Sequence, residues 1–192
     1  RVPTDAGRDA CALTPTDVVS LPASGVPVAM LEQFYQRGCR MIDTTCGSVL
    51  NVWKNVGRYA ETGFTSIIHG KVWHEETQAT ASQAVQYGGK YLVVFDRPET
   101  DIVCDYIRRG GDRDAFLRRF EKAASPGFDP DRDLQHIGLA NQTTMLMSES
   151  LEIGEMIRAA MRERYDDRTL AEHYQAFDMI CTVCCSFIKC AP

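Results

Sequence analysis

The sequence predicts an α/β fold built on a parallel sheet. Short apolar runs of the kind found in buried strands alternate with longer stretches that have helical periodicity. Several of these runs are followed directly by polar residues that can bind ligands, as happens at the carboxyl edge of a parallel sheet. The 192-residue chain is 44% hydrophobic and 24% charged, which is ordinary for a folded domain with a core.

Charge and hydropathy argue against some classes of partner. The net charge is −5, so the surface does not favour broad binding to nucleic acid or to anionic membranes. The longest apolar candidate, residues 179–188, is too short for a membrane span. The chain starts at Arg1, and no targeting segment is visible there. We therefore expect neither a nucleic-acid partner nor a membrane-spanning segment.

The first half of the chain predicts strands and helices in alternation. Apolar runs predict strands at residues 17–21, 39–43, 65–68 and 91–95. Helical periodicity predicts helices at residues 27–37, 49–60 and 75–86. Gly38 and Gly63 end the first two of these helices, and Ser48 is expected to cap the second.

The second half continues the alternation with a loop in the middle. Two helices are predicted at residues 99–109 and 114–124, separated by Gly110 and Gly111. Residues 125–133 are predicted to be a loop because they contain two prolines and a glycine. A strand at 136–140, a long helix at 149–164, a short helix at 169–176 and a strand beginning at 179 complete the prediction.

Polar residues gather just after four of the predicted strands. They are Cys46; then His69, Gly70 and His74; then Gln142, Thr143 and Thr144; and finally Cys181. Because open parallel sheets bind ligands beyond the carboxyl ends of their strands, the four strand ends are predicted to face one cleft.

Several of these residues have both a functional and a purely structural interpretation. Cys46 precedes a helix, where a thiolate is favoured and can bind iron, but it could also be a small residue in a tight turn. His69 and His74 flank a Gly-Lys turn, where they could hold a phosphate, bind zinc, or cap and pack the turn. Cys39 and Cys104 lie in apolar segments and are expected to be buried thiols.

The carboxylate and hydroxyl residues also have both a functional and a structural interpretation. Glu75 and Glu76 open a helix, where the helix dipole favours them, but one of them could instead donate a proton in a site. Thr143 and Thr144 could cap a helix or bind a ligand. The tail resembles a metal-binding cluster but lacks a second pair of zinc ligands; its cysteines are Cys181, Cys184, Cys185 and Cys190.

A first group of short segments comprises Ile-Asp-Thr-Thr-Cys at 42–46, Val-x-x-Val-Trp at 49–53, Ile-Ile-His-Gly-Lys at 67–71 and His-Glu-Glu-Thr-x-Ala-Thr-Ala at 74–81. These segments resemble the LytB/IspH family of 4-hydroxy-3-methylbut-2-enyl diphosphate reductases. The second group resembles the plant and cyanobacterial branch, with Val-Cys-Asp-Tyr-Ile at 103–107, Gly-Phe-Asp-Pro-Asp at 127–131 and Ala-Asn-Gln-Thr-Thr-Met-Leu at 140–146. The resemblance is specific because unrelated segments occur in the family's order, from about residue 17 to Cys181.

The resemblance implies a fold, a cofactor and roles for individual residues. It implies the middle lobe of a three-lobed protein around a 4Fe-4S cluster, with Cys46 and Cys181 as two of the three cysteine ligands. His74 would bind the diphosphate, together with Thr143 and Thr144, and Glu76 would relay a proton beside Thr143. A ferredoxin- or flavodoxin-type donor would supply electrons, in a plastid or in a cyanobacterial cytoplasm.

The chain also departs from the family's pattern. The family's first cysteine and first diphosphate histidine would lie before Arg1, and its third lobe would follow Cys181. Gly47 stands where the family usually has proline. We therefore expect a fragment: residues 1–46 end lobe one, residues 47–176 form lobe two, and residues 177–192 begin lobe three with a divergent tail.

Two alternatives to an enzyme fragment remain open at this stage. One is a non-catalytic α/β binding module derived from the same lobe, and the other is a protein with a zinc-binding tail. Only two of the three cluster ligands and about half of the substrate site are present. We therefore expect these 192 residues alone to be inactive. Reductase activity reconstituted from this chain by itself would contradict that expectation.

Overall fold

The computed structural model describes residues 13–176 and confirms the parallel α/β fold. All pairings between its named strands are parallel, and the strands form two sheets. The smaller sheet pairs β1 (Val18–Leu21) with β2 (Arg40–Asp43). The larger sheet has the order β4-β3-β5-β6, with β3 at Thr65–His69, β4 at Tyr91–Val94, β5 at Ile137–Asn141 and β6 at Tyr174–Ala176.

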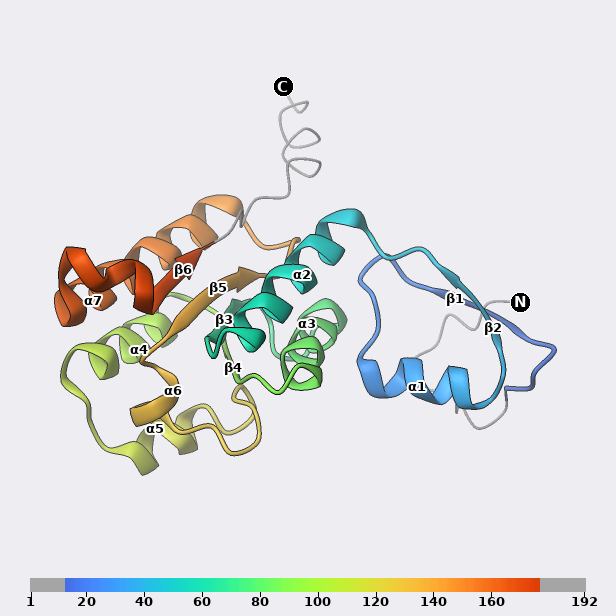
Figure 1. The fold of residues 1–192 in the computed structure, drawn as a ribbon, viewed down its shortest axis with the longest axis horizontal. Coiled ribbons are helices and arrows are strands. Elements are labelled where there is room, and N and C mark those ends of the chain that lie inside the picture. Colours follow the sequence, from blue (N-terminus) through green and yellow to red (C-terminus); the bar gives the residue numbers. More distant parts are fainter. Residues whose placement is uncertain (1–12, 177–192) are drawn as a thin grey trace, which may run out of the picture.

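Helices cover both faces of the four-stranded sheet (Figure 1). In the described part of the chain they are α1 (Val28–Gln36), α2 (Gly47–Glu61), α3 (Glu75–Gln86), α4 (Arg97–Arg109), α5 (Arg113–Arg119), α6 (Pro130–Asp133) and α7 (Met147–His173). Helix α2 packs against α3 on one face, and α4 packs against α7 on the other. Because helices lie on both sides, β3 and β5 are buried along their whole length. Within residues 13–176, no helix has the length and apolar character needed to cross a bilayer.

The strand order creates a switch point between β3 and β5. From β3 the chain passes through α3 to β4 on one side, and it later enters β5 on the other side of β3. The loops that follow β3 and β5 therefore lead to helices on opposite faces of the sheet. In open α/β sheets, such a point leaves a crevice at the carboxyl ends of the strands.

Four details of the predicted secondary structure are wrong. The N-cap of α2 is Cys46 rather than Ser48, because the helix starts at Gly47. The helix predicted at 114–124 ends at Arg119. The loop at 125–133 contains α6, where Asp129 accepts a hydrogen bond from a backbone amide in the first turn and Pro130 takes the first helical position.

The fourth error concerns the segment before Ala176. The break predicted between the two helices is present, because the backbone of α7 is not helical at Asp166 (φ 61°, ψ 173°). The last three residues of the predicted helix form β6 instead, because they pair with the open edge of β5. The helix predicted at 75–86 has the observed bounds of α3. The strand predicted from Met179 and the site residue Cys181 lie outside the described residues.

A glycine in β5 lets α2 approach the sheet closely. A Cβ atom at Gly138 would lie 2.3 Å from Cγ of Tyr59. Tyr59 is fully buried, and its hydroxyl donates to the carbonyl oxygen of Leu139 at 2.9 Å. The aromatic ring therefore lies directly on the glycine, and this contact fixes the distance between α2 and the sheet.

We expect Gly138→Ala to lower the free energy of unfolding by about 1–3 kcal/mol, because the added methyl group overpacks a buried contact. Urea denaturation of the purified chain measures the change. Gly47→Ala is the matched control, since a Cβ atom there meets nothing within 4 Å. Equal stability of the two variants would contradict the proposed role of the glycine.

Candidate functional site

The loops after β3 and β5 meet at the switch point. His69 and Asn141, the last residues of the two strands, are register partners. The backbone amide of Gln142 donates to the carbonyl oxygen of His69 at 2.8 Å, which extends the pairing beyond the strands. Residues 70–74 and residues 142–146 therefore leave the sheet side by side. The structure brings together the second and third of the four predicted strand ends.

Glu76 joins these two loops through its side chain. The residue is 2% exposed and lies in the first turn of α3. Its Oε1 accepts a short hydrogen bond from the backbone amide of Thr143, in the loop after β5. A carboxylate at this position also faces the positive end of the helix dipole. Glu76 and Thr143, which were predicted to be neighbours, are in direct contact.

His74 caps the same helix and thereby fixes its own tautomer. Its Nδ1 accepts a hydrogen bond from the backbone amide of Glu76 at 3.2 Å. In a neutral imidazole the other nitrogen then carries the proton, so Nε2 is a donor. The side chain is partly exposed. The structural interpretation of His74 as a cap is confirmed, and the cap leaves a donor available for a ligand.

Gln142 is the most highly connected side chain in the two loops. It is 3% exposed, and its Oε1 accepts from the backbone amide of Lys71 and from the hydroxyl of Thr77, both at 3.1 Å. Its Nε2 donates to Oγ1 of Thr144 at 2.5 Å. Sequence analysis located Gln142 at a strand end without assigning it a role. Two signals pointed to it: its position after a buried strand and its place in the family-like segment at 140–146.

Thr143 and Thr144 differ in their surroundings. Thr143 is half-buried and holds Glu76 through its backbone amide, whereas Thr144 is exposed. Neither residue caps α7, because the N-cap of that helix is Leu146. The capping interpretation of the two threonines is therefore wrong, and the hydroxyl of Thr144 lies on the surface of the loop.

His69 does not join His74 in an anion site. The ring of His69 is 2% exposed, and its Nδ1 is hydrogen-bonded to Oγ of Ser150 in α7 at 2.8 Å. Burial lowers the pKa of His69 below its usual range. His69 is therefore a core histidine on the α7 side of the sheet, and the predicted pairing of the two imidazoles around Lys71 is wrong.

Cys46 lies at the start of α2, after a strand of the smaller sheet. The residue is half-buried and its thiol is free. Cys46 does not lie on the edge of the four-stranded sheet, since β2 pairs with β1 rather than with β3. That its strand end faces the same cleft as the others stays a prediction. Among residues 13–176, no three His, Cys, Asp or Glu side chains are grouped closely enough to hold a metal ion.

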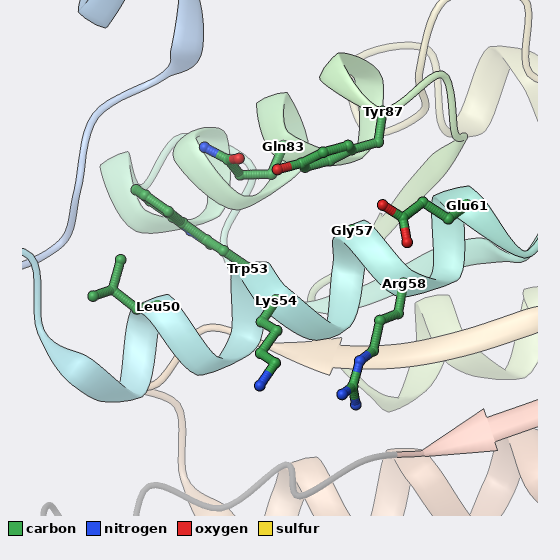
Figure 2. Close-up of a pocket in the computed structure, with 8 residues that line it drawn as sticks. All are labelled: Leu50, Trp53, Lys54, Gly57, Arg58, Glu61, Gln83 and Tyr87. Carbon is green, nitrogen blue, oxygen red and sulfur yellow. The ribbon is translucent and has the colours of Figure 1, made fainter.

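A groove on the outer surface is separate from this site. Figure 2 shows it between α2 and α3, with the ring of Tyr87 over Gly57 and Trp53 further along α2. The indole nitrogen of Trp53 donates to the hydroxyl of Thr80 at 3.1 Å, so this aromatic ring ties the two helices together. The groove is lined by Leu50, Trp53, Lys54, Gly57, Arg58, Glu61, Gln83 and Tyr87, and none of the predicted site residues is among them.

The fold and the site define a parallel α/β protein that presents hydrogen-bond donors and a buried carboxylate at a switch point. The chain belongs to the LytB protein family, whose sequence profile matches residues 4–185. This match confirms the resemblance that the short segments indicated.

Individual relatives with similar sequences are diphosphate reductases, and their chains are longer. The 4-hydroxy-3-methylbut-2-enyl diphosphate reductase of Synechococcus sp. (strain RCC307) is 49% identical over 181 residues, which are 94% of this chain and 44% of that protein. The corresponding reductase of Prochlorococcus marinus (strain MIT 9211) is 53% identical over 165 residues, 86% of this chain and 40% of that protein. This chain therefore spans less than half the length of the curated relatives it matches.

Two solved structures share the fold. The (E)-4-hydroxy-3-methyl-but-2-enyl diphosphate reductase described as the terminal enzyme of the non-mevalonate pathway has a TM-score of 0.61 at 18% identity, over 92% of this chain and 48% of that one. The E-1-hydroxy-2-methyl-but-2-enyl-4-diphosphate reductase of Plasmodium falciparum has a TM-score of 0.61 at 16% identity, over 91% of this chain and 43% of that one. At these identities the similarity supports the fold alone.

We expect the stability of the chain to fall as the pH decreases below about 6.5. Burial lowers the pKa of His69 in the folded state, so the unfolded state takes up a proton first and is favoured. The contribution of His69 to the free energy of unfolding is fully present above the pKa of the unfolded state. It is lost progressively as the pH falls below that value. Urea denaturation between pH 7.5 and 5.5 measures this slope.

His69→Gln should flatten this pH dependence, although it also lowers stability at neutral pH. His136 contributes a slope of the same sign, because burial and the neighbouring His173 lower its pKa too, so the comparison is between the two slopes. An unchanged slope in the variant would contradict the role of His69.

Proposed function

We propose that this chain forms one part of an iron–sulfur reductase that acts on 4-hydroxy-3-methylbut-2-enyl diphosphate. The reaction takes up two electrons and two protons, releases the substrate hydroxyl as water, and gives isopentenyl and dimethylallyl diphosphates. Membership of the LytB family supports the reaction class. The contact between the Glu76 carboxylate and the Thr143 amide carries the proposal, because a buried carboxyl group held in this loop would be suited to proton transfer beside a bound diphosphate.

His74 and Thr144 would hold the diphosphate. The capping bond to Nδ1 makes Nε2 of His74 a donor, and an imidazole donor suits a phosphate oxygen. Thr144 adds an exposed hydroxyl from the loop after β5. The two residues come from opposite sides of the switch point. A diphosphate bound there would therefore be hydrogen-bonded by both loops.

Glu76 would hold the proton that the leaving hydroxyl needs. Its side chain is buried, and the Thr143 amide keeps Oε1 in a fixed position. Loss of a hydroxyl as water requires protonation of its oxygen, and a positioned carboxyl group is a suitable donor. Thr143 lies next to this group and would contact the same end of the substrate.

Cys46 and Cys181 would be two of the cysteine ligands of a 4Fe-4S cluster. Cys46 fits this role, because its thiol is free, is partly accessible and lies at the N-terminus of α2, and thiolates are the usual ligands of iron–sulfur clusters. When bound, the cluster would supply the electrons for reduction and a Lewis-acid iron for the substrate oxygen. Its electrons would come from a ferredoxin- or flavodoxin-type donor.

The chain would contain parts of three lobes. Residues 1–46 would end the first lobe, residues 47–176 would form the second, and residues 177–192 would begin the third. Because the chain spans less than half of its relatives, activity would require further polypeptide. The two sequence relatives, from Synechococcus and Prochlorococcus, are cyanobacterial, which suits a cyanobacterial cytoplasm or a plastid.

We expect Cys46→Ser to abolish or sharply reduce cluster binding in a version extended to the full reading frame. Serine removes the thiolate that iron prefers. The measurement is anaerobic iron and sulfide content with visible spectroscopy, made on this chain and on the extended version. Cys39→Ser is the matched control, since Cys39 is buried and its thiol donates to the carbonyl oxygen of Thr14.

A brown cluster in the extended protein and its Cys39→Ser variant, but not in Cys46→Ser, would support the reductase. A full complement of iron in the Cys46→Ser protein would contradict the ligand assignment. No iron in either length of the unsubstituted chain would instead favour a non-catalytic binding module derived from the same lobe.

A further inference from the structure

We infer that Gln142 is a positioning residue that turns the hydroxyl of Thr144 outward as a hydrogen-bond donor for the diphosphate. The inference rests on the proposed function, because it concerns how the same site recognises its anion. It goes further because it names the cause of the orientation of the Thr144 hydroxyl, which is the side-chain amide of Gln142. It follows from the hydrogen bonds that fill both ends of that amide.

The orientation of the amide is fixed by a backbone donor. The N–H of Lys71 can only donate, so the Gln142 atom that it contacts must be the oxygen, Oε1. The hydroxyl of Thr77 donates to the same oxygen. Nε2 therefore faces Thr144, and it can only donate to Oγ1 of that residue.

This arrangement determines whether the hydroxyl of Thr144 can donate a hydrogen bond to a ligand. A hydroxyl has one proton, and its oxygen already accepts from Gln142. The proton is therefore free to point away from the amide, and the exposed side chain lies on the surface of the loop. A phosphate oxygen requires donors, so the outward O–H is the useful orientation.

Close packing keeps the amide from rotating. A Cβ atom at Gly70 would lie 2.7 Å from Oγ1 of Thr77 and 3.0 Å from Cβ of Gln142. The backbone of the loop after β3 is thus pressed against Gln142, which is itself 3% exposed. Rotation would place Nε2 against the N–H of Lys71, two donors facing each other.

Replacing the amide by a carboxylate in Q142E tests the inference because the two groups have the same shape. One carboxylate oxygen could still accept from Lys71 and Thr77, but the other could only accept from Thr144. The hydroxyl would then donate inward, and only lone pairs would face the anion. Q142E also adds a negative charge, so the test must separate charge from hydroxyl orientation.

A double-mutant cycle makes that separation. Calorimetric titration with sodium pyrophosphate is done on the full 192-residue chain and on Q142E, T144V and the double variant. T144V is expected to weaken binding roughly tenfold or more when Gln142 is present, as loss of a hydrogen bond to a charged group does, and to have no further effect when it is added to Q142E. Gln86→Glu, an exposed change of the same kind on α3, controls for charge alone.

Three results would overturn the inference, and they can be told apart. An equal effect of T144V with and without Q142E would show that Gln142 does not act through Thr144. Binding that is lost in His74→Ala but unchanged in Q142E would leave the proposed function intact and remove the role of Gln142. No binding of pyrophosphate by the unsubstituted chain would count against both.

A second measurement guards against misfolding of Q142E. Thr144→Ser keeps the hydroxyl and is expected to restore most of the pyrophosphate binding that T144V loses. The NMR signals of the Gln142 side-chain amide should shift when pyrophosphate binds to the unsubstituted chain and to Thr144→Ser, but not in T144V. A shift of the same size in T144V would contradict the inference, whatever the stability of Q142E.

Discussion

In the four-stranded sheet, β5 pairs with β3 although β4 lies between them in the chain. This one pairing places two loops from distant parts of the sequence next to each other and sends their helices to opposite faces of the sheet. The bond from the Gln142 amide to the His69 carbonyl continues the pairing past the last strand residues. If β5 paired elsewhere, Glu76 would have no Thr143 amide to bind, and the polar groups of both loops would have no common surface.

Burial of the sheet on both faces explains why so many polar groups at this edge are linked. Side chains such as Glu76, Thr77 and Gln142 are removed from water by the surrounding helices. A buried polar group without a partner costs about 1–3 kcal/mol, so each of these groups needs a hydrogen bond from the opposite loop. The bond from Lys71 to Gln142 also fixes the orientation of the Gln142 amide, and the cap bond within the first turn of α3 fixes the tautomer of His74. Stability and the geometry of the site therefore have a common physical origin.

Much of the fold could be predicted from the sequence, because local signals and tertiary structure agree. Helix α3 begins with two glutamates and has the predicted bounds. Residues 174–176 could not be predicted as a strand, since their polar sequence continues a helix and only the open edge of β5 makes them extended. The site residues were visible as polar groups after apolar strands, but the burial of His69 against Ser150 and the bonds of Gln142 depend on residues more than 60 positions away in the chain. No local pattern encodes those contacts.

The contacts that hold the two loops together have a consequence for how the family can diversify. Glu76 accepts from the main chain of Thr143, and His74 accepts from the main chain of Glu76. Main-chain donors are present in every amino acid except proline. Mutational drift at position 143 could therefore change its hydroxyl while leaving the carboxylate in place, so substrate contacts can evolve separately from the scaffold that carries them.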